Sequence, residues 1–316
     1  MKFVWFGLGM VGLAVVLALL VAYICFYRIF YCPERKKVRD TDRYPVPSGK
    51  EYEPFRDRMY QWIREARELP HRDVSMTSYD GLCLKGRFYE YAPGAPIELL
   101  LHGYRGSAER DLSGGVARCF ALGHSVLIVD HRASGFSEGH IITFGAKESR
   151  DCEAWIQYIL THIDSNAKII LAGVSMGAAT ILITAAKELP KNVVGVLADC
   201  GYTSAEAIIG KVMRDMKLSD RLLLPFARLG ARIYGGFRLA DAAPIHAMQQ
   251  CRLPVLFIHG DGDSFVPCDM SRQNFEACTA PKKLVIIPDA AHGLCFPVAP
   301  EEYVKEAKAF FDPLTQ

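Results

Sequence analysis

The stretch Lys168–Ala186 reads KIILAGVSMGAATILITAA and contains the pentapeptide Gly173-Val174-Ser175-Met176-Gly177. The apolar run before the pentapeptide predicts a buried strand, and the small and apolar residues after it predict a helix. A serine at such a tight turn is held in a strained conformation, and glycines are needed beside it because side chains would collide with neighbouring backbone. We therefore expect Ser175 to be a nucleophile at a strand-to-helix elbow.

A second copy of this pattern lies at Gly135-Phe136-Ser137-Glu138-Gly139, so the pattern alone is weak. The apolar run 125–130 ends five residues before Gly135, and residues 140–145 do not begin an amphipathic helix. We interpret Ser137 as a loop residue.

The surrounding sequence alternates between predicted strands and helices. A helix is expected at 53–69 and a hairpin at 71–92 around an Asp80-Gly81 turn, followed by apolar strands at 97–101, 126–129, 169–172, 193–197, 255–258 and 284–287. This order predicts an α/β fold with a mostly parallel central sheet, helices on both faces and ligand sites at the carboxyl ends of the strands. The segment 203–248 is too long for a plain crossover, so it predicts a helical cap insertion that would carry the specificity.

A nucleophilic serine needs a base, and the base needs an orienting acid. Asp263 follows the strand 255–258, and His292 follows the strand 284–287. Ser175, Asp263 and His292 are therefore expected to form a catalytic triad in the order Ser, Asp, His, each just beyond the end of a strand.

Other polar residues compete for these roles. Asp199 also follows a strand and is either a structural acid or an alternative triad member, whereas Asp261 is interpreted as a solvated turn residue. His102 and His259 precede loop glycines and are interpreted as structural hydrogen-bonding groups.

Backbone N–H groups are expected to bind the oxyanion. Glycines in His102-Gly103-Tyr104-Arg105-Gly106 would let an N–H turn toward the nucleophile. We assign this oxyanion-hole role to the N–H groups of Tyr104 and Met176.

Residues 3–27 contain no charge and are long enough to cross a hydrocarbon core, which needs about 20 residues. A cleaved signal peptide would have a shorter apolar core ending in small residues, so a transmembrane helix is favoured. The expected organisation is an N-terminal anchor at 1–28, a linker at 29–50 and one domain at 51–316 with a cap insertion at about 203–248.

More basic residues follow the apolar segment than precede it. Only Lys2 lies before it, whereas six lie soon after it: Arg28, Arg35, Lys36, Lys37, Arg39 and Arg43. The positive-inside rule then places a single-pass protein in the cell membrane with its domain on the cytoplasmic side, the external side being the alternative. Ten cysteines without C-x-x-C spacing suit buried thiols in a reducing compartment.

The 316-residue chain is 50% hydrophobic and 23% charged, with a net charge of +2, which is typical of a globular protein and gives no argument for nucleic-acid binding. No metal or organic cofactor is expected at this site, and the oligomeric state stays open.

The chain resembles the α/β-hydrolase superfamily, and within it the anchored bacterial hydrolases grouped with serine aminopeptidases and prolyl-oligopeptidase-like esterases. The resemblance covers roughly 70–313 and rests on His102-Gly103 with Arg105-Gly106, Asp130-His131-Arg132, the elbow at Ser175, His259-Gly260 with Asp263, and His292-Gly293. In that family the acid lies three residues after the His-Gly pair, which corresponds to Asp263.

The resemblance implies a membrane-anchored serine hydrolase that cleaves small-molecule or lipid-like acyl esters through an acyl-enzyme. Thioester and peptide cleavage use the same parts and stay open. A non-catalytic membrane-anchored binding module is the alternative of a different class.

Overall fold

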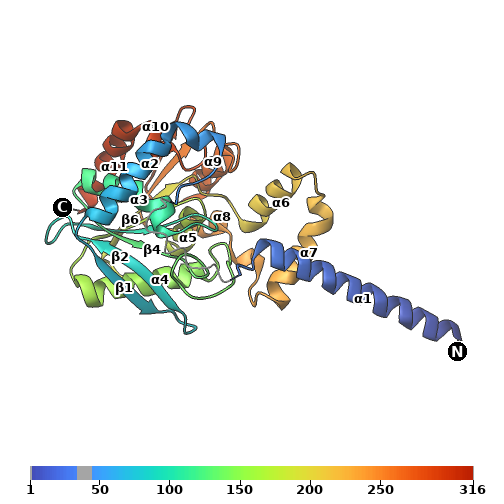
Figure 1. Cartoon of the computed structure of the whole chain (residues 1–316). Coiled ribbons are helices and arrows are strands. Elements are labelled where there is room, and N and C mark those ends of the chain that lie inside the picture. Colours follow the sequence, from blue (N-terminus) through green and yellow to red (C-terminus); the bar gives the residue numbers. More distant parts are fainter. Residues whose placement is uncertain (1, 34–44, 316) are drawn as a thin grey trace.

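The computed structural model describes residues 2–33 and 45–315. The fold is organised around one eight-stranded sheet in the described chain (Figure 1). The strand order is β1-β2-β4-β3-β5-β6-β7-β8. Strand β2 runs antiparallel to both of its neighbours, β1 and β4, and all pairs from β4 to β8 are parallel. The strands are β1 Arg72–Thr77, β2 Cys83–Tyr89, β3 Ile97–Leu101, β4 Ser125–Val129, β5 Ile169–Val174, β6 Val193–Asp199, β7 Val255–Gly260 and β8 Lys282–Ile287.

Helices cover both faces of the sheet. One face packs against α4 Glu148–Tyr158, α5 Met176–Thr184, α8 Pro244–Met248 and α9 Cys268–Ala277. The other packs against α2 Arg56–Glu68, α3 Ala108–Leu122, α10 Cys295–Val298 and α11 Pro300–Thr315. Every residue of β3, β4 and β7 is buried, as expected for strands covered on both sides. The predicted α/β-hydrolase fold class is confirmed.

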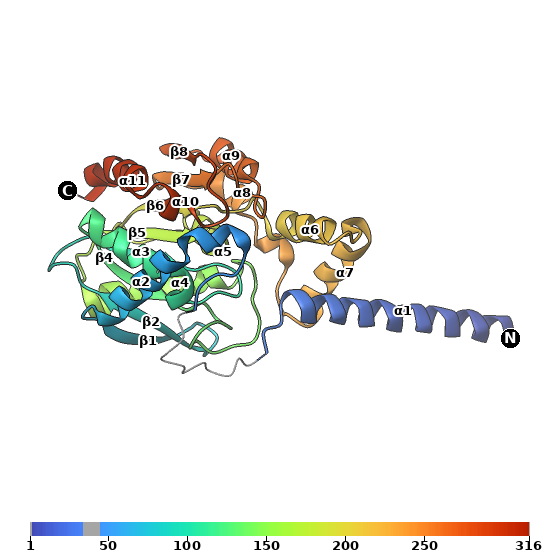
Figure 2. The same cartoon turned by 45° about the horizontal axis from the view of Figure 1, so that its top comes forward.

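Two further helices occupy the segment for which a cap was predicted. Between β6 and α8 lie α6 Ala205–Asp215 and α7 Asp220–Ile233, followed by a short 3₁₀ turn at Leu239–Asp241. Figure 2 shows α6 and α7 beside the long N-terminal helix α1, Lys2–Ile29, which projects away from the sheet.

The N-terminal helix is long and apolar enough to cross a membrane. Its segment Leu8–Ile29 has a mean hydropathy of 2.7 and is mostly exposed. Residues 30–32, which the sequence analysis placed in the linker, instead bond to the domain: Cys32 N–H donates to His140 O (2.7 Å) and Ile142 N–H donates to Phe30 O (2.9 Å). Residues 34–44 of the predicted linker lie outside the described residues.

A charged cluster lies inside the apolar framework of β3. The fully buried Glu98 carboxylate accepts hydrogen bonds from Arg118 Nη1 and Nη2 (3.2 and 2.5 Å) and contacts His124 Nδ1 (2.8 Å). Burial alone would raise the pKa of Glu98, but Arg118 and His124 outweigh it and hold this pKa at about 2. Glu98 is therefore charged at neutral pH and balances the buried Arg118.

Replacing this carboxylate should destabilise the whole domain. Glu98→Gln keeps the size of the side chain but leaves the Arg118 guanidinium buried without a counter-charge, which should lower the free energy of unfolding by about 3–5 kcal/mol. Urea unfolding of the detergent-solubilised protein measures this change. The control is Glu109→Gln, which removes the more exposed pair with Arg67 and should cost at most about 1 kcal/mol. Equal losses in the two variants would contradict the assignment.

Candidate functional site

The predicted elbow joins β5 to α5 and strains its central residue. Ser175 has φ 57° and ψ −115°, a region that non-glycine residues rarely adopt and that costs on the order of 1–3 kcal/mol. A Cβ on Gly173 would lie 2.4 Å from the carbonyl carbon of Gly177, and one on Gly177 would lie 2.1 Å from Leu101 O. Both glycines are therefore required by close backbone approach, as the sequence predicted.

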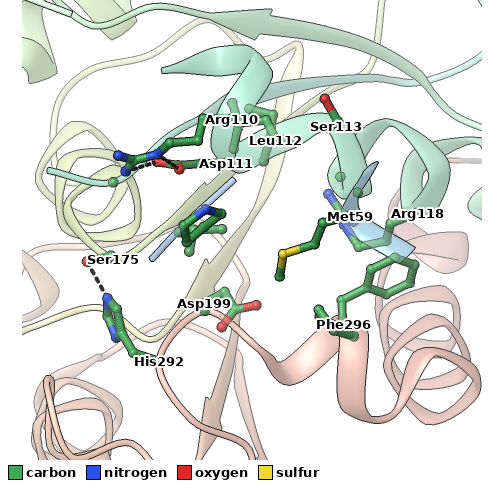
Figure 3. Close-up of a pocket in the computed structure, with 18 of the residues that line it drawn as sticks. Met59, Arg110, Asp111, Leu112, Ser113, Arg118, Ser175, Asp199, His292 and Phe296 are labelled. Carbon is green, nitrogen blue, oxygen red and sulfur yellow. Dashed lines mark hydrogen bonds and ion pairs between the residues drawn. The ribbon is translucent and has the colours of Figure 1, made fainter. Parts of the chain in front are cut away.

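The structure brings the three predicted triad side chains into one hydrogen-bonded chain. His292 Nε2 lies 2.9 Å from Ser175 Oγ (Figure 3). His292 Nδ1 lies 2.6 Å from Asp263 Oδ2. Ser175 and Asp263 are buried, whereas His292 is half-buried. With Nδ1–H donating to Asp263, Nε2 is left as an acceptor for the Ser175 hydroxyl proton.

Further hydrogen bonds hold the Asp263 carboxylate in place. Its Oδ1 accepts the N–H groups of Phe265 (2.9 Å) and Val266 (2.8 Å). On the other oxygen, His259 Nε2 approaches to 3.2 Å. Burial by itself would raise the pKa of Asp263, but the hydrogen bonds from His259 and His292 outweigh it and hold the pKa well below its usual range. Asp263 is therefore an anion throughout the neutral range.

The competing acids occupy other positions. Asp199 Oδ2 accepts the hydroxyl of Tyr303 (3.0 Å), and its Oδ1 has no hydrogen-bond partner among the described residues. Asp261 is exposed and accepts the N–H of Asp289. Neither carboxylate is hydrogen-bonded to His292 in the described structure, so Asp263 is the acid that orients this imidazole.

Each competing histidine is satisfied locally. His102 Nδ1 donates to Gly103 O (2.7 Å) and its Nε2 accepts the His131 N–H (3.0 Å). His259 Nδ1 lies 2.6 Å from Ser271 Oγ, and its Nε2 also lies 2.9 Å from Val266 O. His259 is thus hydrogen-bonded within the framework, as its sequence context predicted, but its contact with Asp263 carried no signal in the sequence.

The second pentapeptide forms a loop. Ser137 Oγ donates to Asp130 O (2.7 Å) and accepts the Lys85 N–H (2.9 Å), so its hydroxyl connects this loop to β2. No helix begins at this serine.

The two residues whose N–H groups are assigned to the oxyanion hole, Tyr104 and Met176, lie near Ser175. Met176 is the first residue of α5, so its N–H is one of those at a helix start that have no acceptor within the helix. Tyr104 lies in the loop between β3 and α3, next to Gly103, on which a Cβ would be 3.5 Å from Ser175 Cβ. Gly103, Tyr104 and Ser175 line the same cavity.

This cavity, of about 210 Å³, extends from Ser175 and His292 between α2 and α3. Its apolar lining includes Trp62 and Ile63. Met59, Leu112 and Phe296 line it as well (Figure 3). The expectation that specificity lies in the cap is wrong for this cavity, because none of its described lining residues belongs to 203–248. In the insertion, α7 packs on α1 and α6 packs on α7. One side of the cavity is lined by α2, through Met59, Trp62 and Ile63.

Several polar groups at the cavity carry no motif and were missed. Tyr52 donates its hydroxyl hydrogen to His292 O (3.0 Å), and Arg110 Nε pairs with Asp111 Oδ1 (2.6 Å). Asp199, which the sequence had already offered as a structural acid or an alternative triad member, also points into the cavity, between His292 and Phe296 (Figure 3). Nothing in the sequence around Tyr52 or Arg110 indicated a cavity. The apolar residues of α2 predicted only a packed helix.

One trio of metal-ligand atom types coincides with the site. Ligand atoms of Cys200, Asp263 and His292 lie within 4.8 Å of one another. Burial raises the pKa of the Cys200 thiol well above its usual range, so it lacks the thiolate that metals prefer. The geometry therefore fits the Ser175 hydrogen-bonded chain better than a metal centre.

Comparisons with known proteins agree with this architecture. A family model described as the alpha/beta hydrolase fold matches residues 99–242. An uncharacterized protein of Mycobacterium tuberculosis is 30% identical over 224 residues, which cover 70% of this chain and 72% of that protein. The uncharacterized protein YqkD of Bacillus subtilis is 28% identical over 192 residues; the match spans 60% of this chain and 63% of that relative, less than two thirds of its length.

Solved structures show the same fold. An esterase from Pyrococcus furiosus superposes with a TM-score of 0.65 at 22% identity, covering 80% of this chain and 96% of the esterase. At that identity the likeness concerns the fold alone. Together, the family match, the Mycobacterium relative and the observed sheet topology show that the chain belongs to the α/β-hydrolase family.

Proposed function

We propose that this protein is a membrane-anchored serine hydrolase that cleaves acyl esters through an acyl-enzyme, with Ser175, His292 and Asp263 as its triad. The observation that carries the proposal is the continuous hydrogen-bonded chain from Ser175 Oγ to Asp263, opening on an apolar cavity. The strained backbone at Ser175 supports it, because such strain persists at functional sites where the surrounding structure maintains it.

In the first half-reaction, His292 Nε2 takes the Ser175 hydroxyl proton while Oγ attacks the ester carbonyl carbon. The carbonyl oxygen becomes an oxyanion, which accepts hydrogen bonds from the Tyr104 and Met176 N–H groups. Asp263 stabilises the imidazolium. The imidazolium then protonates the leaving alkoxide, the C–O bond breaks, and the acyl group stays on Ser175.

In the second half-reaction, water is the nucleophile. His292 accepts a proton from water, and the hydroxide attacks the acyl-serine carbonyl carbon through a second oxyanion. Collapse of this intermediate returns the proton to Ser175 Oγ and releases the carboxylic acid. The residues thus return to their starting protonation states without any cofactor taking part.

The lining of the cavity favours an acyl substrate. Side chains of Met59, Trp62, Ile63 and Leu112 offer an apolar surface beside Ser175, which suits a hydrocarbon chain. Esterases from Pyrococcus furiosus and Pyrobaculum calidifontis share the fold, and ester cleavage is an activity of those proteins. Acyl or protein thioesters and peptides are the alternative substrates, and a non-catalytic binding module is the alternative class.

Covalent labelling should distinguish the two serines that share the pentapeptide pattern. A fluorophosphonate probe should modify Ser175, and Ser175→Ala should abolish both labelling and turnover with the fold intact, since it removes one hydroxyl. Ser137→Ala is the matched control; it loses only loop hydrogen bonds, so folded molecules should still be labelled. Mass spectrometry of the adduct decides the outcome, and modification of Ser137, or none in the wild type, would refute the proposal.

The apolar lining of the cavity also predicts the ranking of substrates. Short and medium acyl esters should have a higher kcat/KM than aminoacyl amides, because the apolar lining contacts an acyl chain. Met59→Asp places a charge in the lining and should lower kcat/KM for the longer esters most. Faster turnover of aminoacyl amides would favour the peptidase alternative instead.

Membrane anchoring belongs to the same proposal. The single described helix that could span a membrane supports an anchor at residues 1–28, followed by a linker to about residue 50 and the hydrolase domain at 51–316 with its insertion at about 203–248. Basic residues after the helix favour the cytoplasmic side for the domain.

Membrane topology can be tested with reporters fused after Gln316. A cytoplasm-dependent reporter should be active and an export-dependent one inactive, and the mature protein should retain its N-terminus. Replacing the basic residues between 35 and 43 with glutamine should weaken this preference, because orientation follows the Lys and Arg bias. Activity of the export-dependent fusion in the wild type would place the domain outside.

A further inference from the structure

The predicted anchor and the predicted oxyanion loop, residues 102–106, meet in the structure. Tyr104 donates its hydroxyl hydrogen to Ile29 O (2.6 Å), in the last turn of α1. Arg105 Nη2 donates to Arg28 O (2.9 Å) and to Tyr31 O (3.2 Å). These contacts join segments more than 70 residues apart, and they involve the residue whose N–H is assigned to the oxyanion.

The electrostatics of a helix end favour this contact. The last carbonyl groups of a helix have no partner within it and carry partial negative charge, so a cation and hydroxyl donors stabilise them. Arg105 and Tyr104 supply both kinds of donor to α1. The Arg105 guanidinium also lies over the Tyr104 ring at 5.1 Å, which links the two side chains to each other.

The helix end is itself held rigidly. Phe30 is fully buried, with edge-on ring contacts to Phe144 (5.8 Å) and Phe237 (5.3 Å). Residues 30–32 pair with residues 140–142 through two backbone hydrogen bonds. The carbonyl groups that receive Tyr104 and Arg105 therefore belong to the domain framework rather than to a loose tether.

The insertion between β6 and α8 fixes the other side of α1. A Cβ on Gly230 of α7 would lie 2.4 Å from Ala22 O, so the two helices touch by their backbones. Tyr234 donates to Leu19 O (3.3 Å) and its ring packs edge-on against Tyr23 (5.3 Å). Leu19 and Ala22 lie within Leu8–Ile29, the segment long and apolar enough to cross a membrane, so α7 contacts the predicted anchor itself.

The oxyanion loop needs such support because its backbone is strained. Arg105 has φ 53°, in the left-handed region that non-glycine residues seldom adopt. Side-chain hydrogen bonds to the end of α1 come from the strained residue Arg105 itself and from Tyr104 directly before it. A displacement of about 1 Å in a catalytic donor is enough to cost about 100-fold in rate.

We infer that the C-terminal turn of α1 is a positioning element of the active site: it holds the oxyanion loop so that the Tyr104 N–H points at the oxyanion. This inference rests on the proposed function. It assigns Tyr104 two separate roles, with the backbone N–H binding the oxyanion and the side-chain hydroxyl acting through α1. The membrane helix then contributes to turnover as well as to localisation.

The test compares kcat and KM of full-length variants in detergent micelles, with a short-chain acyl ester as substrate. Tyr104→Phe removes only the hydroxyl and should lower kcat about tenfold with KM changed less than about twofold, since the loop acts on the transition state. Arg105→Gln should act in the same direction. The double variant should approach the 100- to 1000-fold loss typical of a missing oxyanion donor.

Tyr234→Phe is the matched control, because it removes the same kind of hydrogen bond to α1 at a place remote from the loop. It should keep kcat within about twofold of the wild type, and all variants should keep the wild-type Tm within a few degrees. Wild-type kcat in both Tyr104→Phe and Arg105→Gln would overturn the inference while leaving the triad intact. An equal loss in Tyr234→Phe would also overturn it, and failure of fluorophosphonate to label wild-type Ser175 would refute the proposed function itself.

Discussion

The contact between Gly177 and the carbonyl oxygen of Leu101 constrains the rest of the site. A Cβ at Gly177 would lie only 2.1 Å from that oxygen. Because glycine has no Cβ, α5 can begin directly against the end of β3. This approach places Ser175 beside the loop that follows β3, where a Cβ on Gly103 would lie 3.5 Å from Ser175 Cβ. The strain at Ser175 is maintained by its own backbone bonds, with its N–H donating to Asp199 O and its carbonyl accepting from Ala179.

Asp263 and His292 lie beside each other because each follows one of two paired parallel strands, β7 and β8. Their register sets His259 opposite Ile286 and Gly260 opposite Ile287, so the loops after the two strands leave the sheet side by side. A buried carboxylate in such a place is tolerated only with several donors, and Asp263 has four: two backbone N–H groups and two imidazoles. These donors offset the cost of burying the carboxylate, and they also fix the orientation in which Asp263 holds His292.

Two sets of helices, α2 ahead of the sheet and α6–α7 in the insertion, contact different parts of the molecule. Ahead of the sheet, α2 packs on α3 and lines the cavity with Met59, Trp62 and Ile63. The insertion α6–α7 packs instead on α1, with Gly230 allowing a backbone contact. The cavity beside Ser175 and the predicted anchor α1 are thus contacted by separate elements. The loop at residues 102–106 reaches both, because Tyr104 lines the cavity and bonds to Ile29 O.

The sequence by itself determined the features that depend on local pattern. Strand positions followed from apolar runs, the elbow from glycines around Ser175, the order of Ser175, Asp263 and His292 from strand ends, and α1 from an uncharged run. Only the tertiary structure decided that Glu98 pairs with Arg118, that His259 touches Asp263, that α2 walls the cavity and that Tyr104 bonds to Ile29. The physical reason is that a hydrogen bond or an ion pair needs only two suitable groups within reach. Such groups leave no periodic trace in the chain when folding brings them together from distant positions.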